Sequence, residues 1–535
     1  MTAVPISMAM VGSADAQSGF PDEFDVAQLS ATDGFRMDGE GKNTIQSVIS
    51  LEFSDINGDG FDDIVIGVAY GDTKGRGSVY VVFGSESGIN GPLDLSNLDG
   101  TNGFRVEAES NGNDIGYVVA SAGNFNGDAF DDLLITTPYR GNDDNDDGVV
   151  GAAYVIFGSG DGFPATLKLA DITSSGGEDG FRIQAEENTT DPGSLGLGVA
   201  ASFAGDFNGD GLDDIIIGAP MAYVDYDRRE AGKAYVVFGT DQLITAPLDL
   251  SSLNGSNGVR FDALVRGDKL GASVAGGGDI NGDGIADVIL SAPFADADPE
   301  GNRNTNEGRT YVVFGKDVEK NGAFDSPFDL STLNGNNGFS IEAEIYSSYL
   351  GAYALAGDGD FNGDGLSDVI TGSHTFSNLS GAAYLVFGSK GLVSPDLQLS
   401  TLANGDGTAG LKIPGTAAED GSMARAFAFG DINGDGLDDV IIGAYQTDSE
   451  SGNNAGSVIV VFGQDSDASA SFDLSTLDGG NGFRVLGASA EDYLGKTLAS
   501  GGDFNGDGVD DLLIGVPKDG DYSFQVYLLY GGVTG

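Results

Sequence analysis

The stretch that decides the fold reads DFNGDGLDDIIIGAP at residues 206–220. A loop rich in Asp, Asn and Gly leads directly into an apolar run, and a short Ile-rich run bounded by Gly and Pro is typical of a buried β-strand. The same loop occurs seven times, at residues 55–63, 124–132, 206–214, 279–287, 360–368, 431–439 and 503–511. The chain is therefore built from an internal repeat with a period of 69–82 residues.

Each repeat offers four short strands around its loop. Strand A precedes the loop, strand B follows it, strand C ends in Phe-Gly as at 235–239, and strand D contains Gly-Phe-Arg as at 103–105. Four short strands repeated at a long period are typical of propeller blades, because neighbouring sheets bury each other's faces. We expect an all-β fold, a seven-bladed β-propeller with four antiparallel strands per blade, over residues 17–535.

The two ends of the chain indicate how the ring closes. A D-type run, Gly34-Phe35-Arg36, comes before the first complete repeat, and the last repeat stops at the C-type run 527–531. We expect the N-terminal strand to complete the last blade, since that blade would otherwise expose an unpaired edge. An open solenoid would need polar capping repeats, and neither end resembles one.

Composition excludes several classes of function. The chain has 24 Lys and Arg against 83 Asp and Glu, a net charge of −59, so nucleic acid and anionic membrane are poor partners. It has no Cys and one His, His374, which removes disulfides and thiolate chemistry. No apolar run is long enough to span a membrane. Residues 1–16 contain Ala14-Asp15-Ala16 and are interpreted as a signal-like leader, or alternatively as an unstructured N-terminus.

The repeated loop carries the ligand pattern of a hard cation. Oxygen-bearing side chains stand at positions 1, 3 and 5, a backbone carbonyl is available at position 7, and Asp closes the loop at position 9. Calcium takes six to eight oxygens at about 2.3–2.6 Å in a flexible shell. An EF-hand would need Glu at position 12, but position 12 is apolar or Thr and lies inside strand B. A structural role as a simple turn accounts for the Asn-Gly pair but not for Asp at positions 1, 5 and 9 together.

We therefore expect up to seven Ca²⁺ ions, one in each hairpin between strands A and B. The second loop has Asn124 at position 1 and Ala129 at position 6, so it should bind most weakly. The candidate ligands, with the position-7 residues contributing carbonyl oxygens, are Asp55, Asn57, Asp59, Phe61, Asp63, Asn124, Asn126, Asp128, Phe130, Asp132, Asp206, Asn208, Asp210, Leu212, Asp214, Asp279, Asn281, Asp283, Ile285, Asp287, Asp360, Asn362, Asp364, Leu366, Asp368, Asp431, Asn433, Asp435, Leu437, Asp439, Asp503, Asn505, Asp507, Val509 and Asp511.

In an antiparallel blade, the B–C and D–A loops lie on the face opposite to the A–B hairpins. The longest B–C loops, 138–151, 220–232 and 293–308, contain the residue types enriched at binding hot spots, namely Tyr139, Arg140, Tyr223, Tyr226, Arg228 and Arg229. We hypothesise that this face binds a protein or a glycan, the alternative being variable solvated loops. Arg266-Gly267-Asp268 matches the repeat pattern and is interpreted as framework, as is His374.

The repeat resembles the FG-GAP family, the unit of the integrin α-chain propeller. The motif residues are Phe238-Gly239 and Gly218-Ala219-Pro220, and the resemblance runs from about Phe24 to Gly531. It implies calcium in the A–B hairpins and a non-enzymatic role in adhesion or recognition by a secreted or cell-surface protein. The alternatives are a hydrolase of the glycosylphosphatidylinositol phospholipase D-like class, whose catalytic region needs several His ligands, and a structural matrix protein.

Overall fold

The computed structural model describes most of the chain. The described residues are 20–39, 47–69, 77–89, 91–109, 114–138, 151–186, 196–296, 306–345, 348–374, 381–391, 393–416, 423–449, 451–464, 470–517 and 524–532. The leader predicted at residues 1–16 lies outside them, as do Tyr139 and Arg140 of the predicted partner face.

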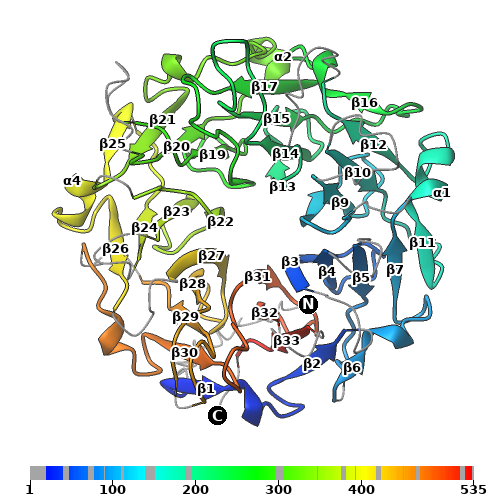
Figure 1. Ribbon diagram of the computed structural model, residues 1–535, viewed down its shortest axis with the longest axis vertical. Helices are drawn as coiled ribbons and strands as arrows, with labels where there is room; N and C mark the ends of the chain where they lie inside the picture. The colour runs from blue at the N-terminus through cyan, green and yellow to red at the C-terminus, as the bar shows by residue number, and fades with distance from the viewer. Residues whose placement is uncertain are drawn as a thin grey trace, which may run out of the picture.

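Seven sheets surround a central axis, with strand A innermost in each (Figure 1). This confirms the seven-bladed propeller. The antiparallel strands, from the inside out, are β3 (Ser47–Ser54), β4 (Asp63–Ala69), β5 (Ser78–Val82) and β7 (Gly103–Glu107) in blade 1; β8 (Val119–Gly123), β9 (Asp132–Thr137), β10 (Ala152–Ile156) and β12 (Gly180–Gln184) in blade 2; β13 (Ala200–Gly205), β14 (Asp214–Ala219), β15 (Lys233–Val237) and β17 (Gly258–Asp262) in blade 3; and β18 (Val274–Gly276), β19 (Val288–Ala292), β20 (Arg309–Val313) and β21 (Gly338–Glu342) in blade 4.

The remaining three blades repeat this order. They are β22 (Leu355–Gly359), β23 (Asp368–Ser373), β24 (Ala382–Val386) and β26 (Gly410–Pro414) in blade 5; β27 (Met423–Gly430), β28 (Asp439–Ala444), β29 (Ser457–Val461) and β30 (Gly482–Leu486) in blade 6; and β31 (Leu498–Gly502), β32 (Asp511–Val516), β33 (Gln525–Leu529) and β2 (Gly34–Asp38) in blade 7.

The hydrophobic core lies between the blades. Strands B and C are buried on both faces, as β4 and β5 show. One apolar cluster joins Phe104 of blade 1 to Tyr154 of blade 2, and similar clusters fill the other interfaces. Each blade therefore depends on both neighbours for its stability.

A fifth, parallel strand lies outside the four predicted ones in five sheets. Four of these strands come from the C–D connection of the next blade, and the fifth comes from the segment that precedes strand D of blade 7. Each pairs with strand D of the preceding blade and so covers an otherwise open edge. These strands are β1 (Glu23–Asp25), β6 (Leu93–Asp94), β11 (Thr166–Lys168), β16 (Leu248–Asp249) and β25 (Asp396–Gln398). Single parallel bridges, Phe261–Phe328 and Lys412–Ser471, take the same place on blades 3 and 5.

Short helical turns accompany these edge segments. One follows each of them and buries a Leu, Val or Ile against the sheet edge. They are η1 (Val26–Gln28), η2 (Leu95–Asn97), α1 (Leu169–Ser174), η3 (Leu250–Ser252), η4 (Leu330–Thr332), α4 (Leu399–Ala403) and η6 (Leu474–Thr476), and α2 (Val318–Asn321) lies earlier in its own C–D connection.

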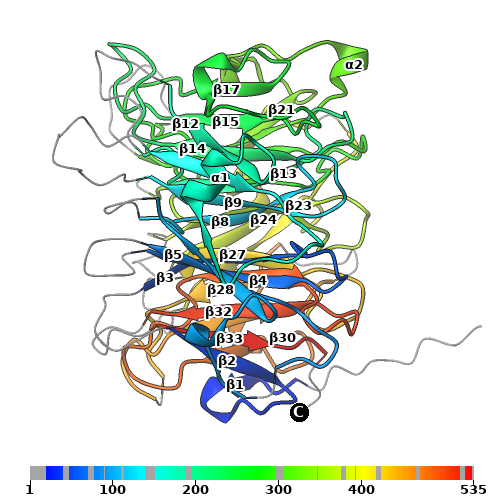
Figure 2. The same ribbon diagram turned by 90° about the vertical axis from the view of Figure 1, so that its right-hand side faces the viewer.

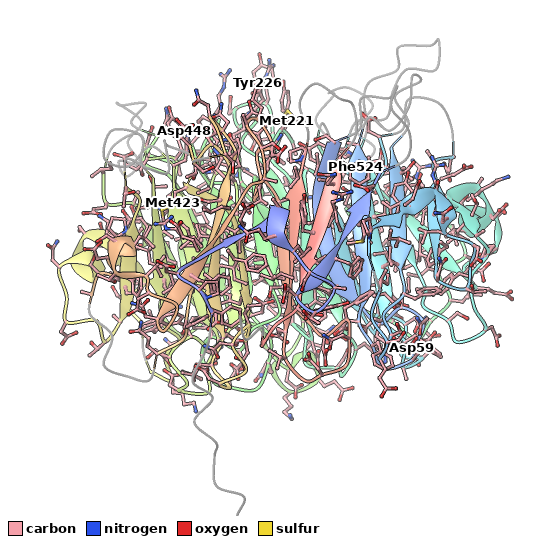
Figure 3. The ribbon with its side chains drawn as sticks, turned by 90° about the horizontal axis from the view of Figure 1, so that it is seen from below. Asp59, Met221, Tyr226, Met423, Asp448 and Phe524 are labelled. Atoms are coloured by element: carbon pink, nitrogen blue, oxygen red, sulfur yellow. The ribbon has the colours of Figure 1, made fainter. Side chains whose placement is uncertain are left out.

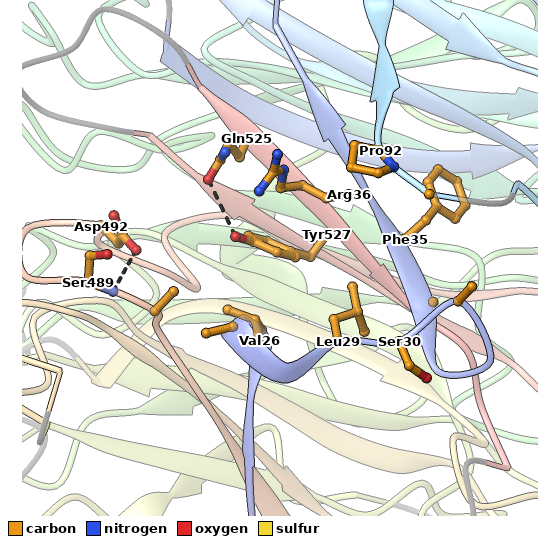
Figure 4. Close-up of a pocket in the computed structure, with 15 residues that line it drawn as sticks. Val26, Leu29, Ser30, Phe35, Arg36, Pro92, Ser489, Asp492, Gln525 and Tyr527 are labelled. Atoms are coloured by element: carbon orange, nitrogen blue, oxygen red, sulfur yellow. Dashed lines mark hydrogen bonds between the residues drawn. The ribbon is translucent and has the colours of Figure 1, made fainter.

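The N-terminal segment closes the ring, as predicted. Strand β2 pairs antiparallel with β33, while β1 pairs in parallel with β30 of blade 6. Phe20 stacks on Phe483 with ring centroids 4.5 Å apart. A hollow of about 390 Å³ lies beside this clasp. Val26 and Leu29 line it opposite Tyr527 of β33 (Figure 4). The segment 20–38 thus completes blade 7 and also pairs with strands of blades 6 and 1, contacts that the sequence did not indicate.

The strands run across the short dimension of the molecule, so their turns emerge on two opposite faces (Figure 2). Asp59 of the first A–B loop lies on one face and Tyr226 of a B–C loop lies on the other (Figure 3). We call these the A–B face and the B–C face. No helix among the described residues is long and apolar enough to cross a membrane.

Candidate metal centres in the A–B loops

The acidic side chains of each loop first shape its backbone. In the third loop, Asp206 at position 1 accepts hydrogen bonds from the amides of Asp210 (2.9 Å) and Gly211 (2.8 Å). Asp210 at position 5 accepts one from the amide of Leu212 (3.0 Å). The same bonds recur in the first, fourth, fifth, sixth and seventh loops. Side-chain oxygens are thereby held on the inside of one tight turn.

The position-9 Asp ties the loop to the body of its blade. Asp214 accepts a hydrogen bond of 2.8 Å from the amide of Gly239, the Gly that follows strand C, and others from Phe207 and Asn208. All seven position-9 residues accept the equivalent Gly bond and are fully buried: Asp63, Asp132, Asp214, Asp287, Asp368, Asp439 and Asp511.

These buried carboxyl groups stand beside further carboxyl groups. Burial, reinforced by the charges at positions 1 and 5, raises the pKa of Asp63, Asp368 and Asp511 to about 8. Burial and Asp128 raise the pKa of Asp132 to about 8 as well. The pKa values of Asp214, Asp287 and Asp439 are also well above the usual range. Ionised together, such groups require a nearby positive charge.

Two loop oxygens are buried without a partner. Among the described residues, Asn208 Oδ1 at position 3 and Asn124 Oδ1 at position 1 have no hydrogen-bond donor. An orphaned acceptor in a ring of acceptors fits a cation better than any protein donor. No three Asp, Glu or His side chains within the described ranges form a metal cluster by themselves. The donor set is instead a mixture of carboxylate, amide and backbone oxygens.

The second loop differs in geometry as well as in sequence. Ala129 occupies position 6 with φ of 79°, where the other loops have Gly at 79–91°. A left-handed backbone is strained for Ala and unstrained for Gly. The substitution singled out in the sequence therefore places local strain at the loop that already lacks Asp at position 1.

Position 8 has a role that sequence reasoning missed. In four loops its Asp accepts a hydrogen bond from the position-1 amide of the preceding blade's loop, for example Asp503 N to Asp62 Oδ2 at 2.9 Å. The other pairs are Asn124–Asp213, Asp360–Asp438 and Asp431–Asp510. The recurrence of acid at position 8 was visible, but a partner one blade away was not.

The position-4 Gly is required by packing between blades. A Cβ on Gly58 would lie 2.4 Å from the ring of Phe130, the position-7 residue of the next loop. Gly363 faces Leu437 in the same way, and Gly506 faces Phe61. The residue at position 7 thus has two roles. Its side chain covers the preceding loop, and its backbone carbonyl remains a predicted calcium ligand.

The B–C face carries the other predicted residues. Tyr226 is 77% exposed, and the guanidinium of Arg229 lies 4.5 Å from its ring centroid and 6.0 Å from that of Tyr223. Arg228 forms an ion pair of 2.7 Å with Asp225. Asp268 of the Arg-Gly-Asp tripeptide is buried and accepts a hydrogen bond from the amide of Val265, which is the position of a framework residue.

Comparisons with known proteins agree with this architecture. The FG-GAP repeat model matches residues 48–82, 198–237, 270–313, 423–461 and 494–529, which are strands A to C of blades 1, 3, 4, 6 and 7. Integrin alpha pat-2 of Caenorhabditis elegans is 30% identical over 50% of this chain and 19% of its own length. Integrin alpha-5 of Xenopus laevis is 27% identical over 48% of this chain and 20% of its own length.

A relative of another kind is the phosphatidylinositol-glycan-specific phospholipase D of Rattus norvegicus, 29% identical over 31% of this chain and 17% of its own length. The matched stretches span a fifth or less of these three relatives. The fold and its repeated loop define a seven-bladed repeat propeller. The chain is an FG-GAP repeat protein with distant similarity to integrin alpha chains.

Proposed function

We propose that this propeller binds calcium in its A–B loops and binds a protein or a glycan partner on its B–C face, outside the cell. The observation that carries the calcium proposal is the buried Asp at position 9 of every loop, beside an acid at position 5 and, in six of the seven loops, a second acid at position 1. Oxygens from positions 1, 3, 5, 7 and 9 would hold the ion. Its charge would offset the carboxylates and so stabilise the folded ring.

The partner proposal is supported by the B–C face and by the relatives. An exposed Tyr under an Arg side chain, as in Tyr226 and Arg229, is a pre-arranged contact of the type enriched at hot spots. Several relatives are integrin alpha chains, and an extracellular adhesion role is proposed by analogy with them.

We propose binding rather than catalysis for this chain. The similarity to a phospholipase D covers less than a third of the chain, and the sequence supplies one His. Turnover of a phosphodiester or a glycosylphosphatidylinositol substrate by the pure protein would overturn this part of the proposal.

Calorimetric titration tests the metal proposal. Calcium added to protein stripped with EDTA should bind at up to seven sites, raise the melting temperature, and be replaced poorly by magnesium, which demands a tighter octahedral shell. Asp206→Asn should remove one site, whereas Asp227→Asn, on an exposed B–C loop, should remove none. A melting temperature that is equal in EDTA and in calcium would contradict the proposal.

A partner screen tests the recognition proposal separately. The calcium-loaded protein is applied to a glycan array and to intact cells, together with a variant carrying Tyr226→Ala, Arg228→Ala and Arg229→Ala. Loss of binding in the variant, with an unchanged melting temperature, supports recognition through this patch. Binding that survives the three substitutions places the partner elsewhere, and no binding at all favours a structural matrix role.

A further inference from the structure

Two cavities along the central channel carry different ionisable side chains. At the B–C face, a cavity of about 510 Å³ is lined by the first residues of the A strands, and its charged side chains are Arg425 and Lys496. Further along the channel toward the A–B loops, a smaller cavity of about 130 Å³ is lined by Glu52 and Asp358. Burial raises the pKa of Glu52 to about 8 and that of Asp358 to about 6. The whole chain has 83 acidic and 24 basic residues. Within the part of the chain that the structure describes, the lining of the cavity at the B–C face has two cations and no carboxylate, which reverses that balance.

Arg425 is held in place by two aromatic rings. It projects from β27, and its guanidinium carbon lies 3.9 Å from the ring centroid of Tyr353 and 5.6 Å from that of Tyr445. Its Nε is buried and has no hydrogen-bond acceptor among the described residues. Neither Arg425 nor the exposed Lys496 forms an ion pair within those ranges, whereas Lys233 and Lys412 each contact a Glu.

An exposed aromatic ring stands beside Arg425 and lines the same cavity as Lys496. Tyr353 is 47% exposed, which is high for a ring at a cavity wall. His374 contacts it edge-on with centroids 4.9 Å apart, and Tyr349 lies 5.8 Å beyond His374. Burial and the charge of Arg425 lower the pKa of His374 to about 4. His374 is therefore neutral near pH 7, and it positions Tyr353 without adding charge to the mouth.

We propose that the channel mouth at the B–C face binds a saccharide unit that carries a single carboxylate. Arg425 and Lys496 bind the carboxylate, and the exposed part of the Tyr353 ring packs against the sugar. Arg pairs with carboxylates through parallel hydrogen bonds, and aromatic faces supply apolar contact area. This inference rests on the proposed function, because it names a ligand class for the face assigned to recognition.

Size and charge restrict the ligand. The volume of about 510 Å³ is in the range of small-molecule sites. A polyanion or an acidic protein would be repelled by the surrounding surface, given a net charge of −59. A small, otherwise neutral saccharide unit with one carboxylate is attracted by Arg425 and Lys496 and carries the least charge for the acidic surface to repel.

The test uses the calcium-loaded full chain at 150 mM NaCl. Binding of sodium glucuronate, glucose and sodium acetate is followed by saturation-transfer NMR and by titration. We expect glucuronate to bind at least tenfold more tightly than glucose or acetate. Arg425→Gln with Lys496→Gln should weaken glucuronate binding at least tenfold. Lys168→Gln, on the outer rim in β11, should leave it unchanged.

Lys496→Gln alone changes an exposed residue and is the second variant, used in case the double variant does not fold. It should still weaken binding severalfold at an unchanged melting temperature. Equal binding of glucose and glucuronate, equal binding of acetate, or full binding by the double variant would each overturn the inference. If calcium and a partner on the array still bind while glucuronate does not, the inference fails alone and the proposed function stands.

Discussion

At the scale of single residues, the strain at Ala129 has a measurable energy. Its φ of 79° costs about 1 kcal/mol relative to Gly. Ala129→Gly should therefore raise the free energy of unfolding by about 1 kcal/mol in urea denaturation with EDTA present. Ala170→Gly, at an exposed position of α1, is the control and should lower it by about 0.5–1 kcal/mol. A loss of stability in Ala129→Gly would refute the strain.

Glu186 gives a prediction on pH. It follows strand β12 and bonds Lys233 of blade 3 at 2.7 Å and Arg260 at 3.1 Å. Burial opposes its ionisation, but Lys233 and Arg260 outweigh burial and hold the pKa of Glu186 below its usual value. A carboxyl with a lowered folded-state pKa stabilises the fold above its unfolded pKa of about 4.3, and this stability is lost as the pH falls below that value.

Glu186→Gln should consequently cost about 3 kcal/mol at pH 7, since it leaves Lys233 buried without its charge partner. The difference from the parent protein should shrink as the pH falls from 5 to 3. Glu230→Gln is the matched control, because Glu230 bonds Lys269 at the same 2.7 Å but is 57% exposed, and it should change stability by less than 1 kcal/mol. Denaturation at a series of pH values measures both.

At the scale of elements, the N-terminal clasp should behave as a separable part. A chain beginning at residue 47 lacks β1 and β2, and so exposes the edges of β30 and β33. We expect a lower melting temperature and self-association, both reversed by a synthetic peptide of residues 20–39. A scrambled peptide should not restore either property. If the shortened chain melted at the same temperature as the parent protein, pairing of β2 with β33 would not contribute to the stability of the closed ring.

The elements also show how far the sequence alone could predict this fold. The Ile-rich B strands and the Asp loops were predictable because seven copies reinforced one pattern, as DIIIGA at 214–219 illustrates. The parallel edge strands were not, because Leu93–Asp94 is two residues long and has no periodicity. Asp62 and Asp503 are 441 residues apart, so their contact depends on ring closure and not on any local signal.

At the scale of the whole molecule, the net charge predicts a dependence on salt. Seven calcium ions would add 14 positive charges, so most of the charge of −59 would remain. Salt shortens the Debye length from about 10 Å at 0.1 M to about 3 Å at 1 M and so weakens repulsion between carboxylates. The melting temperature in EDTA should rise by several degrees between 0.1 and 1 M NaCl. Sucrose of equal osmolality is the control, and a flat response to NaCl would contradict the prediction.

The clasp also has a mechanical consequence. Gly34 lies opposite Leu529 and Asp38 opposite Gln525, so the N-terminal end of β2 and the C-terminal end of β33 are at the same end of the ladder. Tension applied through the two flanking chain segments would peel this ladder one hydrogen bond at a time instead of shearing all of its bonds together. Because β1 and Phe20 precede β2 along the chain, tension from the N-terminal side reaches them first. The force that opens the ring is therefore set by the pairing of β1 with β30 and by the stacking of Phe20 on Phe483.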